Sequence, residues 1–153
     1  MKKKVLAMVL TAVCAMGLMA GCGNSGNAAT GTQNAATESG YKVGISQFAE
    51  HGSLDNCREG FLEGLKEEGI EEGKNLTVDY QNAQTDTGTA STIADSFVSA
   101  KDDLICAIAT PCAASAYNST MNTDIPVVYT AVSDPVSAGL ANEDGSSIGN
   151  ITG

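Results

Sequence analysis

The sequence predicts an α/β fold in which a parallel sheet carries helices on both faces. Two observations lead to this class. Short runs rich in β-branched residues alternate with longer stretches whose apolar residues recur at helical spacing. One run, Leu104 to Ala109, is apolar throughout, which is typical of a central parallel strand buried on both faces. Such alternation builds a parallel sheet because each helix carries the chain back across the sheet.

Four strands are expected, and with three helices between them they give the order βαβαβαβ. Their ranges are residues 41–47, 76–82, 104–109 and 125–131. The segment after the last strand, residues 132–153, is rich in Ser, Gly and Asp and has little periodicity. No regular element is therefore predicted there.

The three expected helices each have a recognisable start. Ser53 is the candidate cap of the first helix and Asp86 that of the second. The apolar stripe of the first helix consists of Leu54, Cys57, Phe61, Leu62 and Leu65. Thr110 and Pro111 open the third helix, because Pro is well tolerated in a first turn, and this helix is expected to end at residue 121 or 122.

The charge of the chain argues against nucleic-acid partners. The formal net charge is −10, with 8 basic and 18 acidic residues. Removal of the three lysines in the leader, Lys2, Lys3 and Lys4, makes the product more acidic still. Such a surface repels phosphate backbones and carries no basic stripe, so nucleic-acid binding is not expected.

The cysteines indicate neither a disulfide framework nor a metal site. Cys14 and Cys22 fall in or next to the leader, which leaves Cys57, Cys106 and Cys112, an odd number without CxxC spacing. A framework needs an even set and a zinc site needs paired ligands. We interpret these three as free thiols, with a Cys106–Cys112 bridge as the alternative. No metal and no cofactor are expected.

The first 40 residues are predicted to be an export signal and a tether. Residues 1–21 combine a basic start, an apolar core and small residues before Cys22, which is typical of a secretory signal peptide. The Ala20-Gly21-Cys22 sequence resembles a bacterial lipobox, which implies acyl chains such as palmitate on Cys22. The alternative is an ordinary leader with a chance cysteine. Residues 22–40 lack large aliphatic side chains and are expected to be a flexible tether.

A candidate binding site lies where the expected strands end. Ligands of open parallel sheets bind beyond the carboxyl ends of the strands. Four segments follow those ends and are expected to meet at one edge: residues 48–53, 83–85, 110–113 and 132–135. Their convergence predicts a site for a small solute.

Individual side chains in these segments each allow two interpretations. Thr110 begins a helix and either helps to bind a carboxylate at the helix N-terminus or simply caps the helix. Phe48 either stacks on a ligand or packs under its loop. His51, the lone histidine, is a polar loop or capping residue if it does not contact a ligand. Ser133 and Asp134 either bind an ammonium group or form an Asp-Pro turn.

Catalytic signatures are not found in the sequence. There is no GxGxxG after a strand, no GxxxxGK[ST] and no GxSxG. An exported hydrolase would need a nucleophile, a base and an orienting group, and His51 is the single histidine available as a base. The chain is therefore not expected to be an enzyme.

Five segments together resemble one known family. They are Lys42–His51, Gly60–Gly69, Ala107–Pro111, Ala131–Pro135 and Gly149–Gly153. In order and spacing they are similar to the ABC-transporter substrate-binding lipoproteins whose better-known members bind tryptophan or tyrosine. The resemblance implies a two-lobed, periplasmic-binding-protein-like fold, of which residues 41–153 would be the N-terminal lobe, with the second lobe absent from this sequence.

The resemblance also implies a set of ligand contacts and a role. Carried over, the contacts are Phe48, His51 and Leu54 for the ligand's side chain, Thr110, Pro111 and Cys112 for its carboxylate, and Ala131, Ser133 and Asp134 for its polar end. The implied role is the capture of an amino acid, with an aromatic one suspected, for delivery to ABC permease subunits. The lipid anchor would hold the protein on the extracytoplasmic face of the cell membrane. The alternative is a lipid-anchored sensing ectodomain that acts on a signalling partner.

Overall fold

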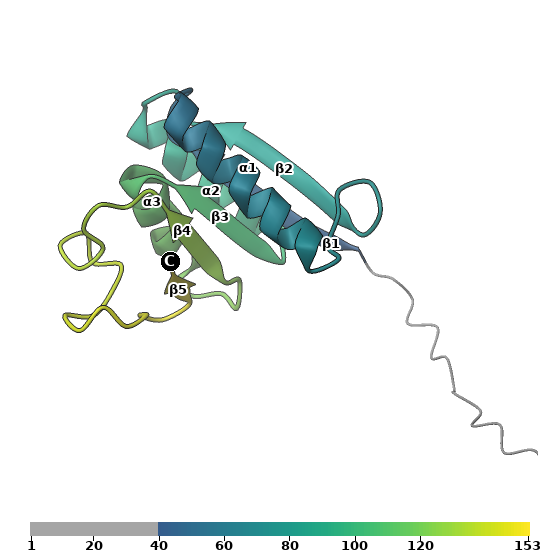
Figure 1. The fold of residues 1–153 in the computed structure, drawn as a ribbon. Coiled ribbons are helices and arrows are strands. Elements are labelled where there is room, and N and C mark those ends of the chain that lie inside the picture. The colour runs from purple at the N-terminus through teal and green to yellow at the C-terminus, as the bar shows by residue number, and fades with distance from the viewer. Residues whose placement is uncertain (1–39) are drawn as a thin grey trace, which may run out of the picture. The chain divides into compact units, whose positions relative to one another are not determined.

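The computed structural model describes residues 40–153, and these form a five-stranded parallel sheet with three helices (Figure 1). The strand order is β2-β1-β3-β4-β5, and every neighbouring pair is parallel. The elements are β1 Tyr41–Gln47, α1 Gly52–Glu67, β2 Leu76–Asn82, α2 Thr87–Ala100, β3 Leu104–Ile108, α3 Thr110–Thr120, β4 Val127–Thr130 and β5 Ile151–Thr152. The predicted α/β class is confirmed.

Two apolar clusters hold a helical layer on each face of the sheet. On one face α1 packs against Val43, Ile45, Cys106 and Ile108. On the other face α2 and α3 pack around Phe97, together with residues of β3 and β4. The strands supply both clusters because successive side chains of a strand point to opposite faces. Figure 1 shows α1 on the near side of the sheet and α2 and α3 behind it.

The predicted apolar stripe of α1 packs on its sheet face as expected. All five stripe residues are partly buried against the cluster beneath α1. No residue of this helix is fully buried, because its other sides face solvent. None of the helices within residues 40–153 is long and apolar enough to cross a bilayer.

The helix starts agree with the sequence in one case and correct it in another. Asp86 caps α2 as predicted, and its Oδ1 accepts the Thr89 N–H at 2.6 Å. The prediction that Ser53 caps α1 is wrong, because the helix begins at Gly52 and Ser53 is already helical. His51 is the cap, and its Nδ1 accepts the Ser53 N–H at 3.2 Å. An imidazole nitrogen is an acceptor when it carries no proton, so it can replace a hydroxyl here.

The strand boundaries are shorter than the sequence suggested. β3 ends at Ile108 because Ala109 already serves as the N-cap of α3. β4 covers only residues 127–130 of the predicted 125–131. β5 was not predicted at all, since two residues carry no detectable periodicity. Its Ile151 is nevertheless buried in the α2–α3 cluster.

An ion pair fastens the amino-terminal edge of the sheet. The Lys42 Nζ lies 2.8 Å from Oδ1 of Asp102, whose side chain is fully buried. Burial raises the pKa of Asp102, and the Lys42 ammonium opposes that rise. Gly44 leaves space for these groups: a Cβ there would lie 2.6 Å from the Phe97 ring and 2.7 Å from Oδ2 of Asp102.

Candidate functional site

The loops after the strands begin side by side at one edge of the sheet, which we call the carboxyl rim (residues 48–51, 83–86, 109–110 and 131–135). In the strand register Gln47 lies opposite Ile108, and Ile108 lies opposite Thr130. Backbone hydrogen bonds continue across the rim: the Phe48 N–H donates to Ile108 O at 3.3 Å, and the Ala109 N–H donates to Thr130 O at 3.0 Å. The predicted convergence of the loops is therefore present.

The rim concentrates unusual backbone conformations. Gln84, Thr85, Ala109 and Ala131 have positive φ angles of 51°, 65°, 80° and 57°. Ala109 is the most extreme, since its φ of 80° and ψ of 155° fall in a region that essentially only glycine adopts. Such residues cluster at binding sites, where the surrounding structure holds them in place.

The N-terminus of α3 is open at the rim. Thr110 is the first helical residue and not the cap. The N-cap is Ala109, whose methyl group cannot accept a hydrogen bond. Orphan backbone N–H groups in the first turn are therefore left for another acceptor, and the helix dipole favours an anion. The arrangement suits a carboxylate.

Cys112 lies under this helix start and not on its surface. The side chain is fully buried in the α2–α3 cluster, and burial raises the pKa of its thiol. The whole residue has no exposed surface. Cys57, Cys106 and Cys112 are all free thiols, as predicted, and burial raises the pKa of Cys106 to about 12.

The three candidate side chains after β1 lie in three different environments. Phe48 is half-buried against the α2–α3 cluster, and Leu54 is half-buried on the α1 side of the sheet. His51 is exposed and engaged as the cap of α1. The two apolar side chains thus lie on opposite sheet faces, with the imidazole between them in sequence.

The residues after β4 form a turn that holds a carboxylate. Ala131 and Ser133 are exposed. Asp134 accepts the Ser137 N–H at 2.9 Å on Oδ1 and the Ser137 hydroxyl at 2.7 Å on Oδ2. The hydroxyl and backbone donors of Ser137 lower the pKa of Asp134. The Asp-Pro turn therefore exists, and its carboxylate stays ionised and available to a cation.

Two features of the rim were missed from the sequence. Gln47 is fully buried at the end of β1, although it is polar. A shallow hollow of about 250 Å³ lies between the first two loops, lined by Ala49, Glu50, Asn82, Gln84 and Thr85. A polar residue at the end of a buried strand was the one available sequence signal for Gln47.

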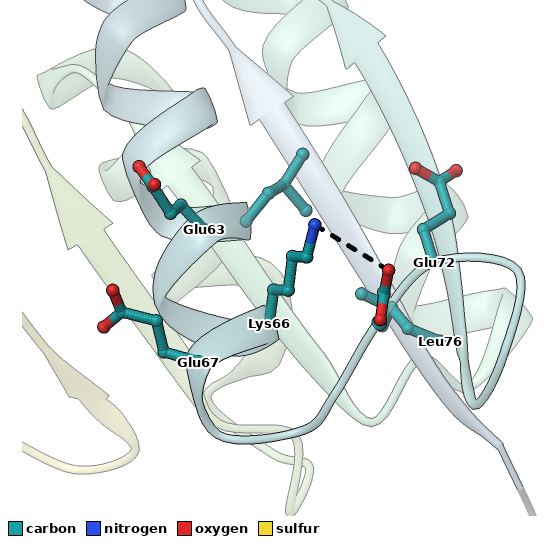
Figure 2. Close-up of a pocket in the computed structure, with 7 residues that line it drawn as sticks. Glu63, Lys66, Glu67, Glu72 and Leu76 are labelled. Atoms are coloured by element: carbon teal, nitrogen blue, oxygen red, sulfur yellow. Dashed lines mark ion pairs between the residues drawn. The ribbon is translucent and has the colours of Figure 1, made fainter.

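A second hollow lies away from the rim (Figure 2). It is lined by Leu62, Glu63, Lys66, Glu67, Glu71, Glu72 and Leu76. These residues come from the end of α1 and the start of β2, so the hollow is at the amino-terminal edge. Lys66 Nζ lies 3.8 Å from Glu71 Oε1, and the acidic side chains are mostly exposed. We interpret it as a solvated surface and place the site at the rim. Within residues 40–153, no group of His, Cys, Asp and Glu is arranged to hold a metal ion.

Comparison with known proteins gives consistent matches. The family described as ABC transporter substrate binding protein matches residues 42–153. A tyrosine-binding protein of Clostridioides difficile (strain R20291) is 42% identical over 153 residues, which is 99% of this chain and 44% of the relative. The chain therefore spans less than half the length of that relative.

Solved structures agree on the fold. The ligand-free, open structure of a substrate binding protein with adhesive properties from Clostridium difficile matches with 46% identity and a TM-score of 0.69 over 74% of this chain and 38% of that one. An ABC domain in complex with L-Trp from Streptococcus pneumoniae matches with 34% identity and a TM-score of 0.69 over 75% and 38%. The described residues thus form one lobe of the periplasmic-binding-protein type, as predicted.

Proposed function

Because the chain belongs to the family of ABC transporter substrate binding proteins, we propose that it captures an aromatic amino acid outside the cytoplasmic membrane and delivers it to ABC permease subunits. Members of this family bind solutes without transforming them, so the chain is not an enzyme, as predicted. The aromatic amino acid is proposed because one relative is named a tyrosine-binding protein and another was solved with L-Trp.

The observation that carries the proposal is the open N-terminus of α3 beside the other rim loops. An α-carboxylate would accept hydrogen bonds from the Thr110 N–H and from the Thr110 hydroxyl at the start of α3. Pro111 has no N–H to donate and would make only van der Waals contacts with the ligand. This geometry would bind the α-carboxylate, which all amino acids share.

The two flanking loops supply the remaining contacts of the proposed site. Ser133 and the ionised Asp134 would bind the ammonium group, with the exposed Ala131 beside them. Phe48, His51 and Leu54 would contact the side chain, and an aromatic ring suits Phe48 because aromatic pairs gain more than their buried area alone. A second lobe closing over the rim would remove the ligand from water and complete the site.

The proposed location depends on Cys22. This residue and the predicted signal and tether lie outside the described residues 40–153. We propose that acylation of Cys22 holds the protein on the extracytoplasmic face of the membrane, since two or more acyl chains give stable anchoring. Metabolic labelling with an alkyne-bearing palmitate analogue should mark the wild-type protein. Labelling of Cys22→Ala to the same extent would exclude this anchor.

Isothermal titration calorimetry tests the proposed ligand. The probes are L-tyrosine, L-tryptophan, L-leucine, a hexose and a nucleoside. The protein is the full-length protein without its lipid. L-tyrosine or L-tryptophan should bind most tightly. Tight binding of the hexose or nucleoside, with none of the amino acids, would refute the proposal.

Thr110→Val tests the carboxylate contact within the same experiment. Loss of one hydroxyl to a charged acceptor should weaken binding by roughly 1–3 kcal/mol. Thr110→Ser keeps the hydroxyl and should retain most of the affinity. Unchanged affinity in Thr110→Val would remove this side chain from the site.

A further inference from the structure

Gln47 lies directly before the first loop of the carboxyl rim. It is the last residue of β1, and its side chain is fully buried. Its backbone lies between Asn82 of β2 and Ile108 of β3. Its carbonyl oxygen accepts the Ala83 N–H at 2.8 Å, which starts the loop after β2. Two of the rim loops therefore leave the sheet next to this residue.

The Gln47 side chain ties the loop after β1 to the helix that follows it. Its Nε2 donates to the Ala49 carbonyl and to Oδ1 of Asp55, both at 2.8 Å. Both partners only accept, so the amide nitrogen is the one group of Gln47 that can serve them. The two hydrogen bonds hold the segment between Phe48 and His51 against the end of β1 and the start of α1.

Asp55 extends this contact to the neighbouring loop. Its Oδ1 lies 3.7 Å from the Arg58 guanidinium, which stands over the Tyr80 ring at 4.5 Å from the ring centre. Asn82 donates from Nδ2 to the Tyr80 hydroxyl at 3.3 Å and accepts the Gln84 N–H on Oδ1 at 2.8 Å. The loops after β1 and β2 are thus joined through a chain of polar contacts.

The polar character of Gln47 is costly for stability alone. Its Oε1 is buried and has no hydrogen-bond partner among the described residues. An unpaired buried acceptor lowers stability, and an apolar side chain of the same size would fill the space without that penalty. The specific contribution of the amide is therefore its two directed hydrogen bonds.

We propose that Gln47 is a positioning residue for ligand binding. It does not contact the ligand, because it has no exposed surface. It fixes the loop that carries Phe48 and His51 by bonding to Ala49 and Asp55. This inference rests on the proposed function, since it concerns the same rim.

Gln47→Met is the main test, because methionine is similar in size and has no donor. The measurements are the Kd for L-tyrosine and L-tryptophan by calorimetry and the Tm. Both are made on the full-length protein without its lipid. Loss of a hydrogen bond to a charged acceptor predicts a Kd increase of roughly tenfold to hundredfold. Ile45→Val is the matched control, since Ile45 is a fully buried neighbour on the same strand. It should lower the Tm without changing the Kd.

Asp55→Ala breaks the same contact from the helix side, where the residue is partly exposed and folding is less at risk. Its effect and that of Gln47→Met should be non-additive in the double variant, because both act through one contact. Additive losses, or a Kd change in Gln47→Met no larger than that in Ile45→Val, would refute the positioning role.

Hydrogen exchange separates this inference from the proposed function. The amides of residues 49–53 should exchange faster in ligand-free Gln47→Met than in Ile45→Val. If the wild-type protein binds neither amino acid, the proposed function fails, and faster exchange still supports the role of Gln47 in fixing the loop. Equal exchange in the two variants would show that the amide does not hold this segment.

Discussion

Replacing Ala109 with glycine should stabilise the lobe. Ala109 has φ 80° and ψ 155°, a conformation that costs a residue with a Cβ about 1–3 kcal/mol. Glycine removes that strain but adds about 0.4–1 kcal/mol of conformational entropy to the unfolded chain. The expected net gain is about 0.5–2 kcal/mol, because the strain is the larger of these two effects. For a domain of this size that corresponds to a rise in Tm of roughly 3–10 °C.

Thermal unfolding followed by circular dichroism measures this change, with urea unfolding as a second measure of the free energy. Ala114→Gly is the control, because it makes the same chemical change inside α3, at a helical backbone position. There glycine should lower stability by about 1 kcal/mol. The two substitutions must therefore have opposite signs. A lower Tm in both would mean that the backbone at Ala109 is not strained.

Two further predictions concern the amino-terminal edge. Lys42→Met leaves the buried Asp102 carboxylate without its cation and should lower the Tm at pH 7. Because burial raises the pKa of Asp102, the folded state binds its proton more tightly than the unfolded state, so the deficit should shrink as the pH falls toward 4; an equal deficit at both pH values would contradict this. Gly44→Ala should cost about 1–3 kcal/mol in urea unfolding, because the new Cβ would lie 2.6 Å from the Phe97 ring. Gly64→Ala in α1, where nothing lies within 4 Å of the new methyl, should not destabilise and serves as its control.

The sequence was sufficient to predict the fold because its periodic signals are strong and local. The apolar run from Leu104 identified the central strand, and the acceptor at Asp86 identified a helix start. The spacing of Leu54, Phe61 and Leu65 identified the face of α1 that packs on the sheet. Each of these signals depends on neighbours within a few residues.

The parts that were missed depend on contacts between distant segments. Ser53 was chosen as a cap from its residue type. The helix begins before it, because the His51 ring accepts a hydrogen bond from the Ser53 N–H. β5 forms because Ile151 pairs with Val127, and two residues hold no pattern of their own. The role of Gln47 depends on its hydrogen bond to Asp55, which lies eight residues further along the chain in the first turn of α1.

The separation of the two sheet edges has an evolutionary consequence. At the edge with Lys42 and Asp102, any side chain at Gly44 would collide with the Phe97 ring and with the Asp102 carboxylate. The opposite edge carries its unusual conformations in short loops such as Gln84–Thr85 and Ala131, whose side chains are exposed. We expect mutations to accumulate in those loops while the scaffold persists, so that the proposed solute specificity changes on an unchanged fold.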